Sequence, residues 1–333
     1  MKISRNLLAV YGGILLVSLA IPFVFPNLLT QMAFLWAMII FALTWDTMGG
    51  QMGYNSFGNI VFFGIGAYAS AVLQRDLELG YVTELLLGMG LGGLLAVLVA
   101  VVIGLSALGL RGHYFAICTL GLSVAAGELA AGWEYIGAGS GMVTPVFPGE
   151  VFSRNLFFYF LLFALAIVNF FFLKWLYSTQ FGLAINAIRD DEDKAEAMGI
   201  HTTRYKVVAW CISAAFLGPA GGALGNLIGF IDPRDVAFAS QTFGVWMVLM
   251  AILGGSHSIW GPVIGATVFH ITQELFWTYL LGWQRVALGL MIVVIVLFFP
   301  YGITGYARQR WPLLFGDWVQ PSTAPEEAAE GGK

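Results

Sequence analysis

A short charged stretch, residues 178–206, lies between two long runs that contain no Asp, Glu, Lys or Arg. Nine of its 29 residues are charged, whereas charged residues make up 10% of the whole chain. The uncharged runs, 155–173 and 207–231, are each close to the length of about 20 residues that a helix needs to cross a bilayer. The charged stretch is therefore expected to lie in water between two membrane helices.

The composition extends this interpretation to the whole chain. Its 333 residues are 59% hydrophobic with a mean hydropathy of +0.83, and soluble domains carry about 25% charged residues. The apolar runs are continuous rather than alternating, which favours helices over the strands of a barrel. We predict an all-α, polytopic membrane protein with a transmembrane domain at 1–310 and a partly disordered cytoplasmic tail at 311–333.

Pro, Gly and charged residues divide the apolar sequence into about ten transmembrane helices. If the N-terminus is cytoplasmic, eleven of the 15 Lys and Arg residues fall on the cytoplasmic side, as the positive-inside rule requires. Both termini are then cytoplasmic. Ser18-Leu19-Ala20 would suit a signal-peptidase site, but the length of the first apolar run favours a retained helix. The predicted spans are 7–25, 29–46, 57–73, 85–109, 114–131, 155–175, 207–230, 240–254, 260–280 and 284–303.

Within the charged stretch, residues 190–199 carry the signals of a short cytoplasmic helix. Asp190 or Asp191 can cap its first turn, acidic residues follow, and Gly199 can end it. Such a helix at a membrane face is suited to docking a soluble partner. The alternative is a solvated loop that only connects two helices.

The third span begins with a polar, glycine-rich segment, 49–59. Irregular backbone at membrane depth is tolerated where it is buried in protein or lines a cavity, and broken helices often form transporter sites. The alternative is a tight cytoplasmic turn before an ordinary helix. From this region the residues predicted to lie near a substrate path are Ser56, Asn59, Gly64, Gly66 and Tyr68.

Ionisable residues well inside the membrane are few, and Glu128, His270 and Glu274 stand out. His270 and Glu274 are four residues apart and share a helix face. Ionisable groups in a membrane are expensive to bury, so we assign these three to the substrate path as well. Both Glu residues also lie near predicted helix ends, which leaves simple surface exposure as the alternative.

Signatures of an enzyme or a metal site are missing from the sequence. It contains no Gly-x-Ser-x-Gly, His-Glu-x-x-His or Walker A motif, and of its four histidines only His270 lies at membrane depth. A bis-histidine haem needs pairs of histidines at that depth, so the sequence argues against a cytochrome b. We expect no catalytic site, no metal and no cofactor, and any ATP-driven work would use a partner's nucleotide site.

Several motifs occur together between about residue 45 and residue 270. In this combination the chain resembles branched-chain amino acid ABC-transporter permeases of the LivM type, and the charged stretch is the most specific part of the match. The matching segments are 62–68, 111–116, 181–182, 187–192, 195–200, Lys206, 213–215, Gly218, 220–222, 229–231, 254–255 and 259–265.

The resemblance implies a permease of a heteromeric importer in a bacterial or archaeal inner membrane. Its partners would be a second permease, two cytoplasmic ATP-binding subunits and a periplasmic or lipid-anchored solute-binding protein, with membrane lipid around it and no nucleic acid. The charged stretch would be the coupling helix that docks in a groove of the ATPase. The implied coupling residues are Arg189, Asp190, Asp191, Glu192, Ala195, Glu196, Ala197, Met198 and Gly199.

Two segments depart from the family pattern, at 56–59 and 137–141. The resemblance therefore leaves the solute open among branched-chain amino acids, urea, short amides and aromatic acids. An ATP-independent channel for a small solute such as urea is an alternative that would need no docking helix. A membrane enzyme acting on lipid is a third hypothesis, but the sequence offers no interfacial cluster of His, Asp or Glu for it.

Overall fold

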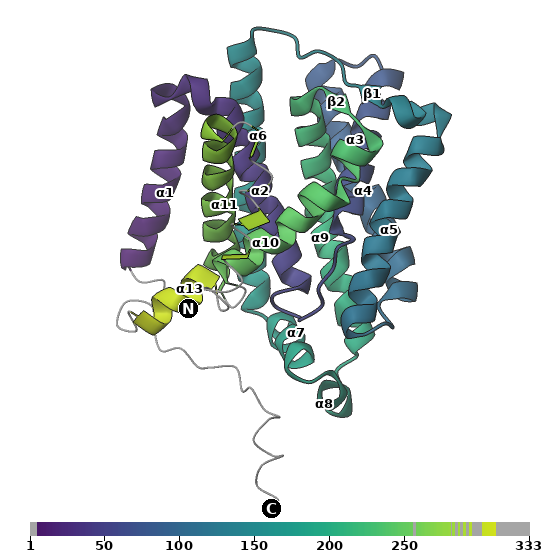
Figure 1. Ribbon diagram of the computed structural model, residues 1–333, viewed down its shortest axis with the longest axis vertical. Helices are drawn as coiled ribbons and strands as arrows, with labels where there is room; N and C mark the ends of the chain where they lie inside the picture. The colour runs from purple at the N-terminus through teal and green to yellow at the C-terminus, as the bar shows by residue number, and fades with distance from the viewer. Residues whose placement is uncertain are drawn as a thin grey trace, which may run out of the picture.

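The computed structural model describes residues 5–255, 258–280, 282–283, 286, 289–290, 293–294 and 302–310. Over these residues the fold is all-α, as predicted, and helices run up and down through one body (Figure 1). One two-residue pair of strands, β1 (Met142–Val143) and β2 (Phe230–Ile231), is antiparallel with Met142 opposite Ile231. The helices are α1 (Arg5–Val24), α2 (Leu29–Met48), α3 (Asn59–Asp76), α4 (Tyr81–Ala107), α5 (Gly112–Gly132), α6 (Val151–Tyr177), α7 (Gln180–Asp190), α8 (Glu192–Ala197), α9 (Thr202–Ile228), α10 (Val245–Gly254), α11 (Trp260–Tyr279) and α13 (Gly302–Arg310).

The described chain has six helical segments long and apolar enough to cross a membrane. The count of ten spans stays a prediction, because most of the tenth, 284–303, and the tail, 311–333, lie outside the described residues. The six segments are Pro26–Met48, Tyr81–Ala107, Gly112–Gly132, Val151–Tyr177, Thr202–Ile228 and Pro233–Gly254.

Helices α3, α4 and α9 form a tight bundle in which backbones touch at glycines. A Cβ atom at Gly66 of α3 would lie 1.9 Å from the carbonyl oxygen of Gly218 in α9, and one at Gly92 of α4 would lie 2.8 Å from the Gly66 Cα. No hydrophobic effect drives helices together in lipid, so close packing at small residues supplies the attraction. These glycines therefore fix the centre of the fold.

The chain is irregular between α9 and α10, where the sequence predicted only a short break. Gly229, with a φ of +87°, ends α9. Two single turns follow, η4 (Pro233–Ala237) and η5 (Ser240–Gly244), before α10 begins at Val245. The predicted span 240–254 is thus a ten-residue helix preceded by η5. Helix α10 alone is about 15 Å long, roughly half the thickness of a bilayer core.

The turns of the fold gather at two ends (Figure 1). The end drawn at the bottom carries α7, α8, the α2–α3 connection and the α4–α5 turn. The opposite end carries β1 and β2. The predicted charged stretch therefore lies at one end of the helices, as the sequence analysis requires, and its contacts there are described next.

Candidate functional site

The charged stretch folds into two helices, where the sequence predicted one. Helix α7 begins after Thr179, whose hydroxyl accepts a hydrogen bond from the Phe181 N–H at 3.2 Å. Arg189 and Asp190 form the last turn of α7 and pair with each other at 3.1 Å, so they do not belong to the second helix. Of the two predicted caps, Asp190 is therefore wrong and Asp191 remains.

Helix α8 begins and ends as its sequence signals predict. The Asp191 carboxylate caps it by accepting a hydrogen bond from the Lys194 N–H at 3.0 Å. At the other end, Gly199 has a φ of +88°, and the Ile200 N–H bonds back to the Ala195 carbonyl at 3.0 Å. This closure is typical of a Schellman motif, in which glycine takes the left-handed position without strain.

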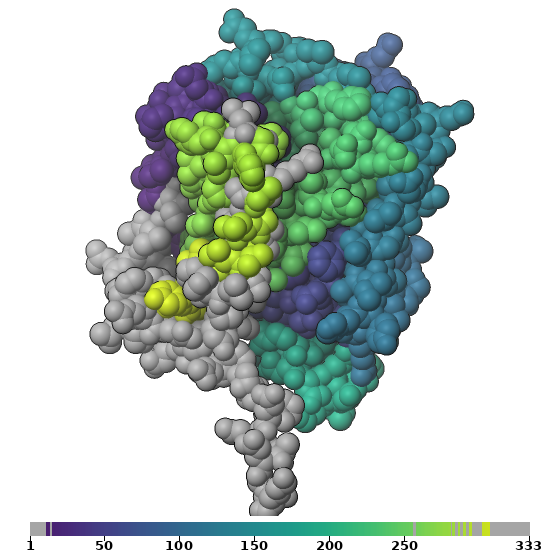
Figure 2. All heavy atoms as spheres, in the orientation of Figure 1, coloured from purple at the N-terminus to yellow at the C-terminus, as the bar shows by residue number. Residues whose placement is uncertain are grey.

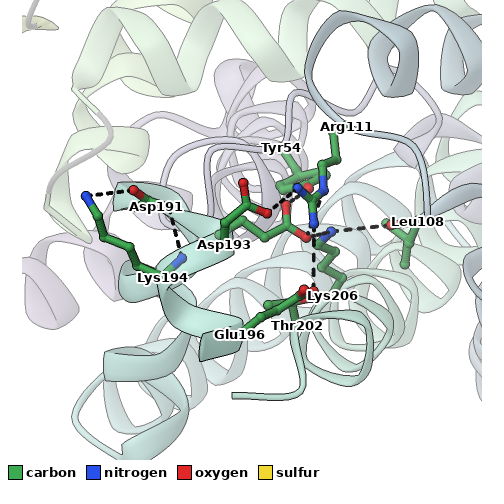
Figure 3. A network of polar contacts seen from close by, with 10 residues as sticks. Tyr54, Leu108, Arg111, Asp191, Asp193, Lys194, Glu196, Thr202 and Lys206 are labelled. Carbon is green, nitrogen blue, oxygen red and sulfur yellow. Dashed lines mark hydrogen bonds and ion pairs between the residues drawn. The ribbon is translucent and has the colours of Figure 1, made fainter. Parts of the chain in front are cut away.

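Glu192, at the start of α8, is the centre of a polar network that ties the helix to the membrane body. Figure 3 shows other members of this network, Tyr54, Arg111 and Lys206, beside α8. One carboxylate oxygen accepts from the Lys206 ammonium of α9, and the other accepts from the Tyr54 hydroxyl of the α2–α3 connection. Lys206 is 2% exposed, and its Nζ lies 4.3 Å from the centre of the Tyr54 ring. A single side chain thus connects three segments that are far apart in the sequence.

Arg111, in the α4–α5 turn, adds a fourth segment to this network. Its Nη1 lies 2.6 Å from the Asp193 carboxylate, and its other nitrogens lie 3.6 Å from Glu192 and 3.8 Å from Glu196. Glu196 also accepts a hydrogen bond from the Thr202 hydroxyl at 2.5 Å. The outer contacts are exposed and screened by solvent, so the buried pair of Glu192 and Lys206 is the stronger anchor.

The network changes the ionisation of its members. Burial acts to raise the pKa of the Glu192 carboxyl, but hydrogen bonds from Lys206 and Tyr54 and the nearby positive charges outweigh it and hold the pKa below its ordinary value. The pKa of the Asp191 carboxyl is lowered by its bonds to Lys194. Burial and the bond to Glu192 raise the pKa of Tyr54. Glu192 is therefore a carboxylate at neutral pH.

Apolar groups are exposed on α7 and at the end of α8. Met198 is 83% exposed and Leu183 is 73% exposed, and Ala197 is exposed as well. In Figure 2 the teal-green spheres of this region project from the lower end of the described chain. Ala195, in contrast, is 2% exposed and packs inward, which corrects the expectation that it belongs to an outward docking face.

Ser56 and Asn59, predicted to line a substrate path, are buried at the α2–α3 break. The Asn59 side-chain oxygen accepts from the Trp210 ring N–H at 2.9 Å, while its amide nitrogen has no hydrogen-bond partner. The Ser56 carbonyl accepts from the Trp45 ring N–H at 2.7 Å. Gly64 and Gly66 make backbone contacts: a Cβ at Gly64 would lie 2.4 Å from the Phe238 ring.

The other predicted path residues do not gather with these. Tyr68 lines a cavity between α3, α4 and α5. Glu128 is an exposed residue of α5 that pairs with Arg234 at 2.7 Å. His270 packs its Nε2 2.8 Å from the Gln31 carbonyl of α2, and Glu274 is half-buried one turn further along α11. The eight residues therefore do not form one site.

Sequence reasoning missed the inner partners of the network. Tyr54 and Arg111 carry no local signal, and Lys206 is the last residue of the charged stretch. Asp46 was missed too: it is 1% exposed in α2 and accepts a hydrogen bond from Gln51 at 2.9 Å. A charged residue directly at the edge of an uncharged apolar run is the signal that would have found Lys206 and Asp46.

Comparison with known proteins gives one family. A family described as branched-chain amino acid transport system, permease component, matches residues 27–298. The high-affinity branched-chain amino acid transport permease LivM of Salmonella typhimurium is 28% identical over 84% of this chain and 70% of its own length. LivM of Escherichia coli is 27% identical over 91% of this chain and 76% of its length, and LivH of Escherichia coli is 31% identical over 38% and 40%. No solved structure matches.

Proposed function

Because the chain belongs to the branched-chain amino acid transport permease family, we propose that it moves its solute into the cytoplasm by coupling to a separate ATPase through α7 and α8. The chain is a multi-pass membrane protein and a permease component of an ABC transporter. The observation that carries the proposal is an outward apolar surface, Met198 and Leu183, on short helices anchored to the body. Isolated helices this short are marginal in water, so a partner's groove would complete their stability.

The network around Glu192 supplies the mechanical link in this proposal. A rigid-body movement of α8 would pull on Tyr54 in the α2–α3 connection and on Lys206 in α9 at the same time. Helix α9 packs against α3 and α4 at glycines, where a shift of one backbone moves the next. Binding and hydrolysis of ATP in the partner would therefore reach the helices without any nucleotide or cofactor on this chain.

The solute is proposed to be a branched-chain amino acid or a related small polar or amphipathic molecule, delivered by a solute-binding protein at the β1–β2 end. We place the path near the α2–α3 break, because the Asn59 amide nitrogen is buried without a partner. Asn59→Leu should lower uptake while the ATPase stays bound. Trp210→Phe, which removes the same hydrogen bond from the other side, is the matched control. If Asn59→Leu and Trp210→Phe change uptake equally, Asn59 acts only through its hydrogen bond to Trp210 and is a packing residue.

Docking is tested with charge placed on the outward surface. Met198→Glu combined with Leu183→Glu should abolish co-purification of the ATPase with the tagged chain and abolish uptake, since an apolar groove excludes two carboxylates. Val146→Glu, at an 89% exposed position of the opposite end, is the control. An ATPase still bound by the double variant would refute docking at this surface.

Topology is tested by labelling single cysteines in a background without Cys118 and Cys211. Both termini and the α7–α8 end are proposed to be cytoplasmic. Val143→Cys, at a 72% exposed position, should react with an impermeant thiol reagent added to whole cells, and Met198→Cys should react only after the cells are opened. The reverse pattern would invert the orientation.

A further inference from the structure

A cavity of about 700 Å³ lies between α3, α4 and α5, the helices drawn on the right-hand side of Figure 1. Its wall on α4 runs from Leu91 to Ile103, which is roughly 18 Å along a helix axis. The volume falls within the range of about 300–1,000 Å³ typical of ligand sites. Because the lining extends over this length, the cavity suits an extended ligand.

The wall of this cavity is almost entirely apolar. Its lining is aliphatic along most of its length, with Val61, Ile65 and Leu122 as examples, and Phe238 closes the inner side. Among the described lining residues away from the rim, Tyr68 supplies one hydroxyl, which is buried without a hydrogen-bond partner. A zwitterionic amino acid would leave an ammonium and a carboxylate unpaired here, at a large free-energy cost. The transported solute is therefore a poor fit.

The rim of the cavity has the chemistry of a membrane interface. Trp133 and Tyr135 lie at the mouth, 60% and 53% exposed, beside Asp76. Arg75 lies over the Tyr135 ring at 4.5 Å, pairs with the Asp76 carboxylate at 2.7 Å and donates to the Tyr135 carbonyl at 2.7 Å. Trp and Tyr are enriched at the level of lipid headgroups. The rim thus marks the depth at which a headgroup would lie.

The cavity is continuous with the lipid-facing surface. Next to its lining residues on α4, Leu94 and Leu98 are 58% and 52% exposed, and Leu129 on α5 is 76% exposed. Its length of about 18 Å is close to one leaflet, half of a hydrocarbon core about 30 Å thick. We propose that this cavity binds one acyl chain of a membrane phospholipid, with the headgroup at the level of Trp133 and Tyr135.

The lipid would complete the packing that α5 lacks. Helices α3, α4 and α9 touch through glycine, but the space beside α5 is too wide for their side chains to fill. An acyl chain restores dispersion contacts that an empty space forfeits. Lipid binding in this cavity does not depend on ATPase docking at α7 and α8. Either proposal can therefore fail its test without affecting the other.

The test uses the full chain in lipid nanodiscs that contain a phospholipid with a photoreactive diazirine in one acyl chain. Val61 is 3% exposed and lines the cavity, so the lipid reaches it only from inside, whereas Leu98 faces bulk lipid. We expect label on both residues in the native chain. Ala126→Phe, which fills the cavity, should remove at least nine-tenths of the label on Val61 and leave that on Leu98 unchanged. Val124→Phe, on the outer face of α5, should change neither.

A second variant guards against misfolding of the first. Leu95→Trp fills the cavity from α4, with Leu94→Trp as its lipid-facing control. Absence of label on Val61 in the native chain, or equal label in the filled variants, would overturn the proposal. So would a disulfide-length cross-link from Leu95→Cys to another subunit in the assembled transporter, since the cavity would then be a protein interface.

Discussion

In the bundle of α3, α4 and α9 backbones touch directly at Gly66, Gly92 and Gly218, whereas α8 is attached by side chains that reach from three other segments. The bundle has no charged contact at its glycine crossings. Helix α8 has Glu192 bound by Lys206 and Tyr54, with Arg111 outside. The difference follows from the surroundings: dispersion and close approach act in lipid, while charge pairs act where water ends. A crossing of backbones is rigid, but a side-chain network transmits movement.

The largest effect is expected at the bundle. Gly66→Leu places a side chain where even a Cβ lies 1.9 Å from the Gly218 carbonyl oxygen, so α3 and α9 must separate. We expect loss of monodisperse protein on size-exclusion chromatography, beyond the 1–3 kcal/mol or so of ordinary overpacking. Gly90→Leu, at a helix position with nothing within 4 Å, is the control. Folded Gly66→Leu protein would show that the crossing tolerates separation.

The next effect is expected at the network. Lys206→Met leaves the Glu192 carboxylate without its buried partner and should destabilise the protein by about 3 kcal/mol, measured as a lower Tm in detergent. Uptake should fall with it. Lys194→Met, which breaks only an exposed pair with Asp191, should leave Tm unchanged. Equal Tm values for the two variants would mean that the Glu192–Lys206 pair does not stabilise the fold.

A smaller effect is expected at the end of α8. Gly199→Val forces a branched side chain into a left-handed conformation, at a cost of roughly 1 kcal/mol, and disturbs the surface beside Met198. The chain should stay in the membrane while uptake falls steeply. Gly199→Asn, which tolerates this conformation better, should recover most of the uptake. Wild-type uptake by Gly199→Val would remove this turn from the coupling surface.

The smallest effect concerns pH. The pKa of Glu192 is held below its ordinary value of 4.5, so the carboxylate stabilises the folded state above that value and the stabilisation is lost as pH falls through the lowered pKa. Glu192 should therefore cause no change in Tm between about pH 6 and pH 8. Below about pH 4 the native chain should lose more Tm than Glu192→Gln. Parallel curves of Tm against pH for the native chain and Glu192→Gln would show that the fold does not lower the pKa of Glu192.

Sequence reasoning reached the membrane class and the ends of α8 because those features are local. A continuous apolar run, the Asp191 cap and the Gly199 stop each act within a few residues. It missed α7, which continues through Asp190, because two helices can share one charged stretch.

Contacts between distant segments escaped prediction for a different reason. Tyr54 and Lys206 meet at Glu192 only because of how α2, α3 and α9 pack. The eight predicted path residues lie in different places, since no sequence pattern says that His270 faces α2 while Tyr68 lines the cavity beside α5. Composition selects candidates, and packing decides which of them meet.

The central claim, that α7 and α8 dock an ATPase, is tested most directly by photocross-linking in the native host. A photoreactive amino acid at Met198, the most exposed apolar position of α8 and its turn, should cross-link to a protein whose peptides contain a Walker A motif. The same amino acid at Val146, at the opposite end, should not. A Met198 cross-link only to lipid, or to no nucleotide-binding protein, would contradict the account.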